Sequence, residues 1–215
     1  MQGKPRRWIW ITLLAVLLLP FACCMAGVGF RLVDRGFLRR WVERLTLSRD
    51  GTSPEALLLP PQVLPEGWRA DPINTGRPAS ALFYGQQDAA MRGFRYGTDK
   101  AREASGVSHA VARYPTEETA HRDYLVHQRS TFGNLDPWAE MEKWGYESPH
   151  AHESNLEFAT ELRKGGRVGR CVFVARYGRY VSELVLMVYL EDMNVEQVKA
   201  LVVAADEMFS GLRDK

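Results

Sequence analysis

Apolar residues dominate one long stretch near the N-terminus of the chain. Residues 8–30 form 23 consecutive uncharged positions. A helix of that length extends about 35 Å, enough to cross the roughly 30 Å hydrocarbon core of a bilayer. The pattern predicts one transmembrane helix, with residues 1–30 as a short basic tail and membrane anchor. Two processed forms stay open, a lipoprotein that begins at Cys23 and a cleaved signal peptide.

The next residues are amphipathic and then rich in proline. Residues 31–47 carry apolar side chains four positions apart with arginines on the other side, as in a basic amphipathic helix on an anionic membrane surface. A continuation of the membrane helix as a stalk explains the same pattern. Residues 48–65 contain four prolines, which predict an extended linker.

Alternation of apolar and polar positions predicts a folded domain over residues 66–215. A period of two marks strands, and a period of 3.6 marks helices. The expected strands are 81–84, 92–96, 107–114, 156–162, 168–177 and 180–190, and the expected helices run from Thr116 to about residue 130 and from Asn194 to just before Gly211, with one helical turn near Glu140. Gly178 and Arg179 suit a two-residue type II′ hairpin turn.

These elements predict the fold class α+β, an antiparallel sheet with two main helices packed on it, preceded by the transmembrane helix. Strand 180–190 is almost continuously apolar, so we expect it at the centre of the sheet with both faces covered. Asn194 and Gln197 form a capping box at the start of the last helix. The apolar stripe of that helix, with Leu201 at its middle, is expected to lie over Leu186.

Charge divides the chain into two parts. Residues 1–64 hold nine Lys or Arg and four Asp or Glu, whereas residues 65–215 hold 19 and 22. The mildly acidic domain is therefore not expected to bind nucleic acid. The purely basic N-terminal tail favours an N-terminus inside the cell, which places the domain outside the cytoplasm.

Few residues suggest catalytic chemistry. His150 and His152 project the same way on an extended segment and could share Zn²⁺ with a third ligand from elsewhere. An exposed loop after Pro149 explains the pair without a metal. The strand parity of Cys171 predicts a buried thiol. The sequence has neither a Gly-x-Ser-x-Gly elbow nor a phosphate-binding Gly-rich loop, so we assign no catalytic residue and no cofactor.

One basic cluster has no acidic residue between Leu162 and Ser182. Its members are Arg163, Lys164, Arg167, Arg170, Arg176 and Arg179. The cluster predicts either a contact with an anion, a lipid headgroup or a docked partner, or a charged hairpin that protects a sheet edge.

The end of the chain carries a resemblance. The segment from Arg176 to Val181, the long apolar strand and the final helix resemble the ends of bacterial membrane-anchored and lipoprotein ectodomains of unknown function, which are similar to the PsbP-like α/β sandwich. The resemblance covers about residues 105–130 and 156–212. It implies an antiparallel sheet packed with helices, and it assigns no ligand residue. Because the membrane anchor departs from the soluble PsbP type, no photosynthetic role is implied.

Together these features favour a single-pass protein of the cell membrane whose extracytoplasmic domain is a non-enzymatic binding or interaction module. One form of such a module is an accessory subunit of a membrane protein assembly. Its expected partners are the lipid bilayer and a membrane protein. The alternative is a metal-dependent enzyme that uses His150 and His152.

Overall fold

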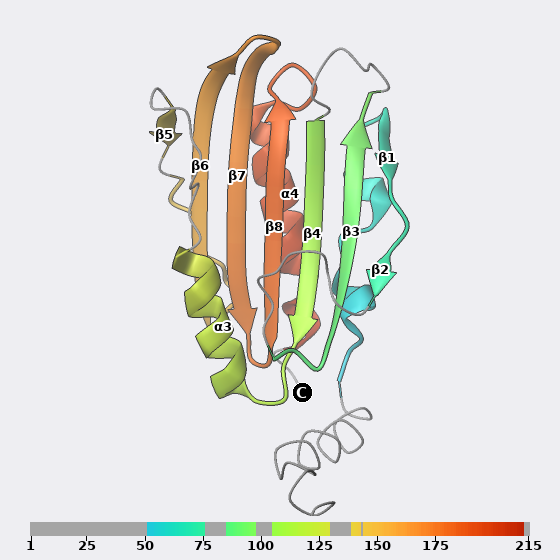
Figure 1. The fold of residues 1–215 in the computed structure, drawn as a ribbon, viewed down its shortest axis with the longest axis vertical. Coiled ribbons are helices and arrows are strands. Elements are labelled where there is room, and N and C mark those ends of the chain that lie inside the picture. The colour runs from blue at the N-terminus through green and yellow to red at the C-terminus, as the bar shows by residue number, and fades with distance from the viewer. Residues whose placement is uncertain (1–50, 76–84, 98–104, 130–138, 143, 213–215) are drawn as a thin grey trace, which may run out of the picture. The chain divides into compact units, whose positions relative to one another are not determined.

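A single antiparallel sheet organises the part of the chain that the computed structural model describes, residues 51–75, 85–97, 105–129, 139–142 and 144–212. The strands are β1 (Trp68–Ala70), β2 (Asn74–Thr75), β3 (Asp88–Tyr96), β4 (Ser105–Arg113), β5 (Glu140–Glu142), β6 (Glu153–Arg163), β7 (Gly166–Tyr177) and β8 (Tyr180–Tyr189). The eight-stranded sheet has the order β1-β3-β4-β8-β7-β6-β5, with β2 paired to β3 (Figure 1). As the sequence predicts, β8 is central.

Two helices cover opposite faces of the sheet. In the view of Figure 1, α3 (Glu117–Arg129) lies on the front face and α4 (Val195–Glu207) on the rear face. Alternate residues of β7 divide in the same way, because Val174 packs in the cluster under α3 and Phe173 in the cluster under α4. The predicted α+β class, with an antiparallel sheet and two helices, is therefore confirmed.

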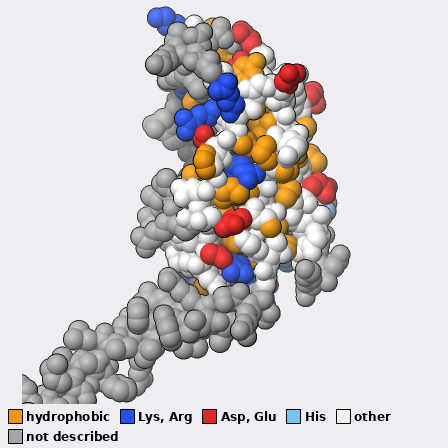
Figure 2. Space-filling view, turned by 90° about the vertical axis from the view of Figure 1, so that its right-hand side faces the viewer, with side chains coloured by type: hydrophobic (Ala, Val, Ile, Leu, Met, Phe, Trp, Pro, Cys, Tyr) orange, Lys and Arg blue, Asp and Glu red, His pale blue; other side chains and the backbone are white. Residues whose placement is uncertain are grey.

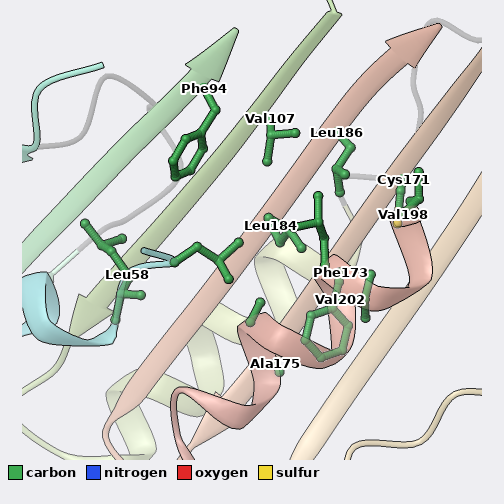
Figure 3. Close-up of a cluster of buried hydrophobic side chains, with 14 of the residues drawn as sticks. Leu58, Phe94, Val107, Cys171, Phe173, Ala175, Leu184, Leu186, Val198 and Val202 are labelled. Atoms are coloured by element: carbon green, nitrogen blue, oxygen red, sulfur yellow. The ribbon is translucent and has the colours of Figure 1, made fainter. Parts of the chain in front are cut away.

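The main hydrophobic core lies between the rear face and α4. Figure 3 shows Val198 and Val202 of the helix near Phe173, Leu184 and Leu186 of the central strands. The helix begins with the predicted capping box: Asn194 Oδ1 accepts a hydrogen bond from the backbone N–H of Gln197 at 3.0 Å, and the Gln197 side chain accepts one from the N–H of Asn194. These bonds satisfy two of the N–H groups that a helix start leaves unpaired.

The segment before β1 is packed in the domain and is not the extended linker that the sequence predicts for residues 48–65. Contacts divide the chain between Asp50 and Gly51. The short 3-10 helices η1 (Pro54–Leu57) and η2 (Pro61–Val63) follow, each with a proline in its first position. Leu57, Leu58 and Leu59 are buried in the main core. Pro54 and Pro61 start tight turns, and the leucines between them belong to the domain.

Polar bonds hold this segment against the rear face. The backbone N–H of Leu59 donates to Nδ1 of His109 at 2.9 Å, and Nη1 of Arg92 donates to the carbonyl oxygen of Leu59 at 3.0 Å. Because Nδ1 of His109 accepts, Nε2 carries the ring proton toward Ser182 Oγ, 2.9 Å away. His109 is fully buried, and burial lowers its pKa to about 3. The imidazole is therefore a neutral bridge between the segment and the sheet.

The remaining local predictions have mixed outcomes. Thr116 Oγ1 accepts the N–H of Thr119 and caps α3 as expected. Gly178 has a φ of +59° and Arg179 does not have a positive φ, as a type II′ turn requires. The helical turn expected near Glu140 is wrong, because residues 140–142 pair with β6 as β5.

Several predictions fall on residues outside those described. These are the transmembrane helix of residues 8–30, the amphipathic helix of residues 31–47 and the strand 81–84. None of the helices in the described ranges has the length and apolar character needed to cross a membrane.

Candidate binding site

The front face is covered by α3 over one end, next to the β7–β8 turn (Figure 1). The cluster beneath the helix is rich in small residues, and its members are Ala89, Ala110, Ala112, Tyr114, Ala120, Tyr124, Val174 and Val181. Small side chains on the sheet let the helix approach closely. Toward the other end of β3, β4 and β8, no described helix lies over the front face.

A groove lies on that uncovered end, which we call the front groove. It has a volume of about 400 Å³, and its front-face lining is Asp71, Gly93, Arg95, Gly106, Ser108, Val185 and Met187. Strand pairing places Gly93 beside Ser108, and Gly106 between Arg95 and Met187. Gly93, Gly106 and Ser108 are therefore neighbours on the front face. Their small side chains leave the space that forms the groove.

The two glycines of the floor differ in what surrounds them. A Cβ on Gly93 would lie 2.8 Å from Oδ2 of Asp71, so packing explains this glycine. A Cβ on Gly106 would have one neighbour among the described residues, the Phe94 carbonyl oxygen at 3.9 Å. Glycine inside a strand is destabilising and often marks the close approach of a ligand or another backbone. Packing does not explain Gly106, so this glycine is better explained by the close approach of a ligand or another backbone.

Two arginines lie side by side next to the front groove: Arg95 lines it, and Arg69 lies one strand further out. Arg69 of β1 and Arg95 of β3 are direct cross-strand partners, and both are exposed. Asp71 pairs with Arg95, its Oδ2 lying 3.1 Å from both Nε and Nη2. Within the described part of the chain Arg69 has no ion pair. From the edge formed by β1 and β2, basic and acidic side chains are seen among hydrophobic ones (Figure 2).

The structure separates the basic cluster expected from the sequence. Arg163, Lys164 and Arg167 lie at the β6–β7 turn, whereas Arg176 and Arg179 lie at the opposite end of β7. Arg163 pairs with the carboxylate of Glu161, Arg167 with that of Glu140 and Arg176 with that of Glu153. The six residues therefore do not form one surface.

Arg170 and Arg163 both neighbour a residue of the front groove. Arg170 is the cross-strand partner of Met187, which lines the groove. Nη1 of Arg163 lies 4.0 Å from Sδ of Met187. One part of the predicted cluster thus borders the groove on the side away from Arg69 and Arg95.

His150 and His152 have separate neighbours. Nε2 of His150 lies 3.3 Å from Oε1 of Glu207, and Nδ1 of His152 accepts the backbone N–H of Gly178 at 3.1 Å. The described ranges contain no group of three or more His, Cys, Asp or Glu side chains that could hold a metal ion. The described residues therefore supply no third ligand for the expected pair.

Cys171 lies in the main core with no exposed surface, as its strand parity predicts. Burial raises the pKa of its thiol above the usual range. A protonated, enclosed thiol is a poor nucleophile, so Cys171 has a packing role.

A buried polar cluster under α3 was missed by the sequence analysis. The side chain of His127 has no exposed surface. Its Nε2 lies 3.2 Å from Oδ2 of Asp123, and its Nδ1 lies 3.4 Å from Oε1 of Glu183. The Tyr114 hydroxyl donates to Asp123. Burial alone would lower the pKa of His127, but the two carboxylates outweigh it and raise the pKa to about 9. The cluster therefore pairs α3 with β8 through a charged imidazolium.

Comparisons with known proteins add a fold and no family. No protein-family model matches the chain, and no curated protein does. A solved structure, the extracellular domain of PknH from Mycobacterium tuberculosis, matches with a TM-score of 0.53 and 13% identity over 78% of this chain and 100% of that chain. At this identity the match shows the fold alone. The PsbP-like resemblance stays a prediction.

Proposed function

We propose that this protein is a membrane-anchored binding module whose domain lies outside the cytoplasm and takes a small ligand in the front groove. The observation that carries the proposal is Gly106, the second residue of β4 in the groove floor, where an added Cβ would have one neighbour among the described residues, the Phe94 carbonyl oxygen at 3.9 Å. An extracellular domain with the same fold supports the placement. The absence of a described metal cluster around His150 and His152 leaves the enzyme alternative without a supporting observation.

Filling the groove tests this function. Gly106→Val puts a branched side chain into the floor, and valine suits a strand better than glycine does. Ligand-observed NMR with a library of small molecules should give hits for the unaltered domain that are lost in the variant. Hits that persist in the variant, or no hits for either protein, would contradict the proposal.

The proposed anchor has its own test. An uncleaved span in residues 8–30 keeps Met1 on the mature chain and holds the protein in the membrane through an alkaline wash. Intact-mass measurement checks the N-terminus. A lipid-bearing N-terminus at Cys23 would replace the transmembrane helix by a lipid anchor, and a soluble chain would contradict both.

A partner within the membrane is the finer part of the proposal. Ala22 and Ala26 lie four positions apart in the expected span, close to two glycines. Small residues at this spacing allow two membrane helices to approach closely. Purification of the full chain in a mild detergent should recover a stoichiometric membrane protein, and Ala22→Leu with Ala26→Leu should release it. Recovery of the full chain alone would contradict an accessory-subunit role.

A further inference from the structure

We infer that the front groove takes an amphipathic anion, with the anionic group between Arg69 and Arg95 and the apolar part along Gly106, Val185 and Met187. The inference rests on the proposed function and names the class of ligand for the same groove. The anionic group is a carboxylate or a phosphate, because both match the planar donor array of a guanidinium group.

The arginine pair supplies the argument for an anion. Like charges placed directly opposite each other in adjacent antiparallel strands are destabilising, and Arg69 and Arg95 occupy such positions. Among the described residues, the carboxylate of Asp71 pairs with Arg95, so one positive charge is left in excess beside this end of the groove. With side-chain exposures of 71% for Arg95 and 39% for Asp71, the ion pair is accessible to solvent and can rearrange around a ligand.

The floor supplies the argument for an apolar part. Val185 is a large apolar residue with 37% of its surface exposed on the front face, and Met187 is partly exposed beside it. Gly106 lies between Arg95 and Met187 in the same cross-strand row. Arg95 and Met187 are two strand spacings apart, about 10 Å. This distance suits a short alkyl chain that runs from the arginine pair across the glycine floor.

Matched probes separate the two parts of the ligand. Isothermal titration calorimetry would use the unit that begins at Gly51, with octyl phosphate, octanoate, octanol and inorganic phosphate as ligands. We expect octyl phosphate and octanoate to bind, and octanol and inorganic phosphate to bind at least about tenfold more weakly, since each lacks one of the two contacts. The ratio between octyl phosphate and octanoate identifies the preferred anionic group.

Three variants locate the contacts. Arg69→Gln and Arg95→Gln should each lower the affinity for octyl phosphate about tenfold and leave the affinity for octanol unchanged. Gly106→Val should lower the affinity for both. Lys199→Gln removes the same charge from the exposed face of α4, where Lys199 pairs with Glu196, and should change neither.

The outcomes distinguish this inference from the proposed function. Octanol binding as tightly as octyl phosphate would overturn the anion, and inorganic phosphate binding as tightly would overturn the apolar part. In both cases a loss of binding in Gly106→Val would still support the groove as a site. If no probe binds, the ligand class is wrong. If the probes bind equally to Gly106→Val, the groove is not their site and both proposals fall.

Discussion

The two faces of the sheet are built from the same strands, but they are packed in different ways. On the rear face, large side chains such as Phe158, Phe173 and Leu186 fill the space beneath α4. On the front face, alanines lie beneath α3 and glycines lie beyond the region it covers. Small residues thus serve two purposes on one face. They bring α3 close where it lies on the sheet, and they leave a groove where it does not.

The strands of the groove also hold the N-terminal segment of the domain. Arg92 and His109 bind Leu59 on the rear face, and each is next in sequence to a groove residue, Gly93 or Ser108. A shift of these strands would therefore change contacts on both faces of the sheet.

The largest effect is expected from removing the segment before β1. A domain that begins at Glu66 lacks Leu57, Leu58 and Leu59, which are at most 3% exposed. Burial of each leucine contributes roughly 1.5–3 kcal/mol, so together they approach the 5–15 kcal/mol that stabilises a typical domain. We expect no cooperative thermal transition for this variant and a sharp one for the domain that begins at Gly51. Equal thermal transitions in the two proteins would show that residues 51–65 are a linker that does not stabilise the domain.

The next effect concerns the core beneath α4. Leu201 is 2% exposed, so Leu201→Ala removes buried methyl groups and should lower the free energy of unfolding by about 2–5 kcal/mol. Glu196→Ala, on the exposed side of the helix, should lower it by about 0.5 kcal/mol or less. Urea unfolding curves compare the two variants. Equal, small changes would show that the stripe does not face a core.

Local signals explain what the sequence predicted well. The capping box of Asn194 depends on residues three apart, and the central place of β8 follows from its own apolar run. The same kind of signal misled the interpretation of residues 48–65, because prolines mark both extended linkers and the starts of 3-10 turns.

The candidate site, in contrast, depends on the register in which the strands pair, which the sequence does not reveal. Arg69 and Arg95 become neighbours only when three-residue β1 pairs with β3. The spacing of Asp123 and His127 on a helix was visible in the sequence, but the approach of Glu183 was not. Neither the groove nor the buried cluster could therefore be read from spacing alone.

The polar cluster beneath α3 predicts that the domain loses stability as the pH rises above neutrality. The pKa of His127 is about 9 in the folded protein, above its ordinary value of 6.5, because Asp123 on α3 and Glu183 on β8 face it, with Tyr114 beside Asp123. The stabilisation is complete below about pH 6.5 and is lost as the pH rises through about 9, since the imidazolium then loses its proton. Each unit of pKa difference corresponds to about 1.4 kcal/mol.

Urea unfolding of the domain at a series of pH values measures this loss. The free energy of unfolding should fall between about pH 6.5 and pH 9 in the unaltered domain. His127→Gln should be less stable at pH 6 and should lose most of the slope in this range, because glutamine does not titrate. A slope that is unchanged in His127→Gln would assign the titration to another group.

The smallest effects come from one substitution made on each face, and they are expected to have opposite signs. Gly169→Ala on the rear side of β7 would bring a Cβ to 2.9 Å from Cδ2 of Leu190 and 3.2 Å from Cε2 of Phe158, so overpacking should destabilise the domain by about 1–3 kcal/mol. Gly106→Ala meets no such contact and should stabilise it by about 0.5–1 kcal/mol, since alanine loses less backbone freedom on folding. Differential scanning calorimetry of both variants measures the two signs. A destabilised Gly106→Ala variant would mean that the floor of the groove is already packed. The two faces would then not differ in packing at β4.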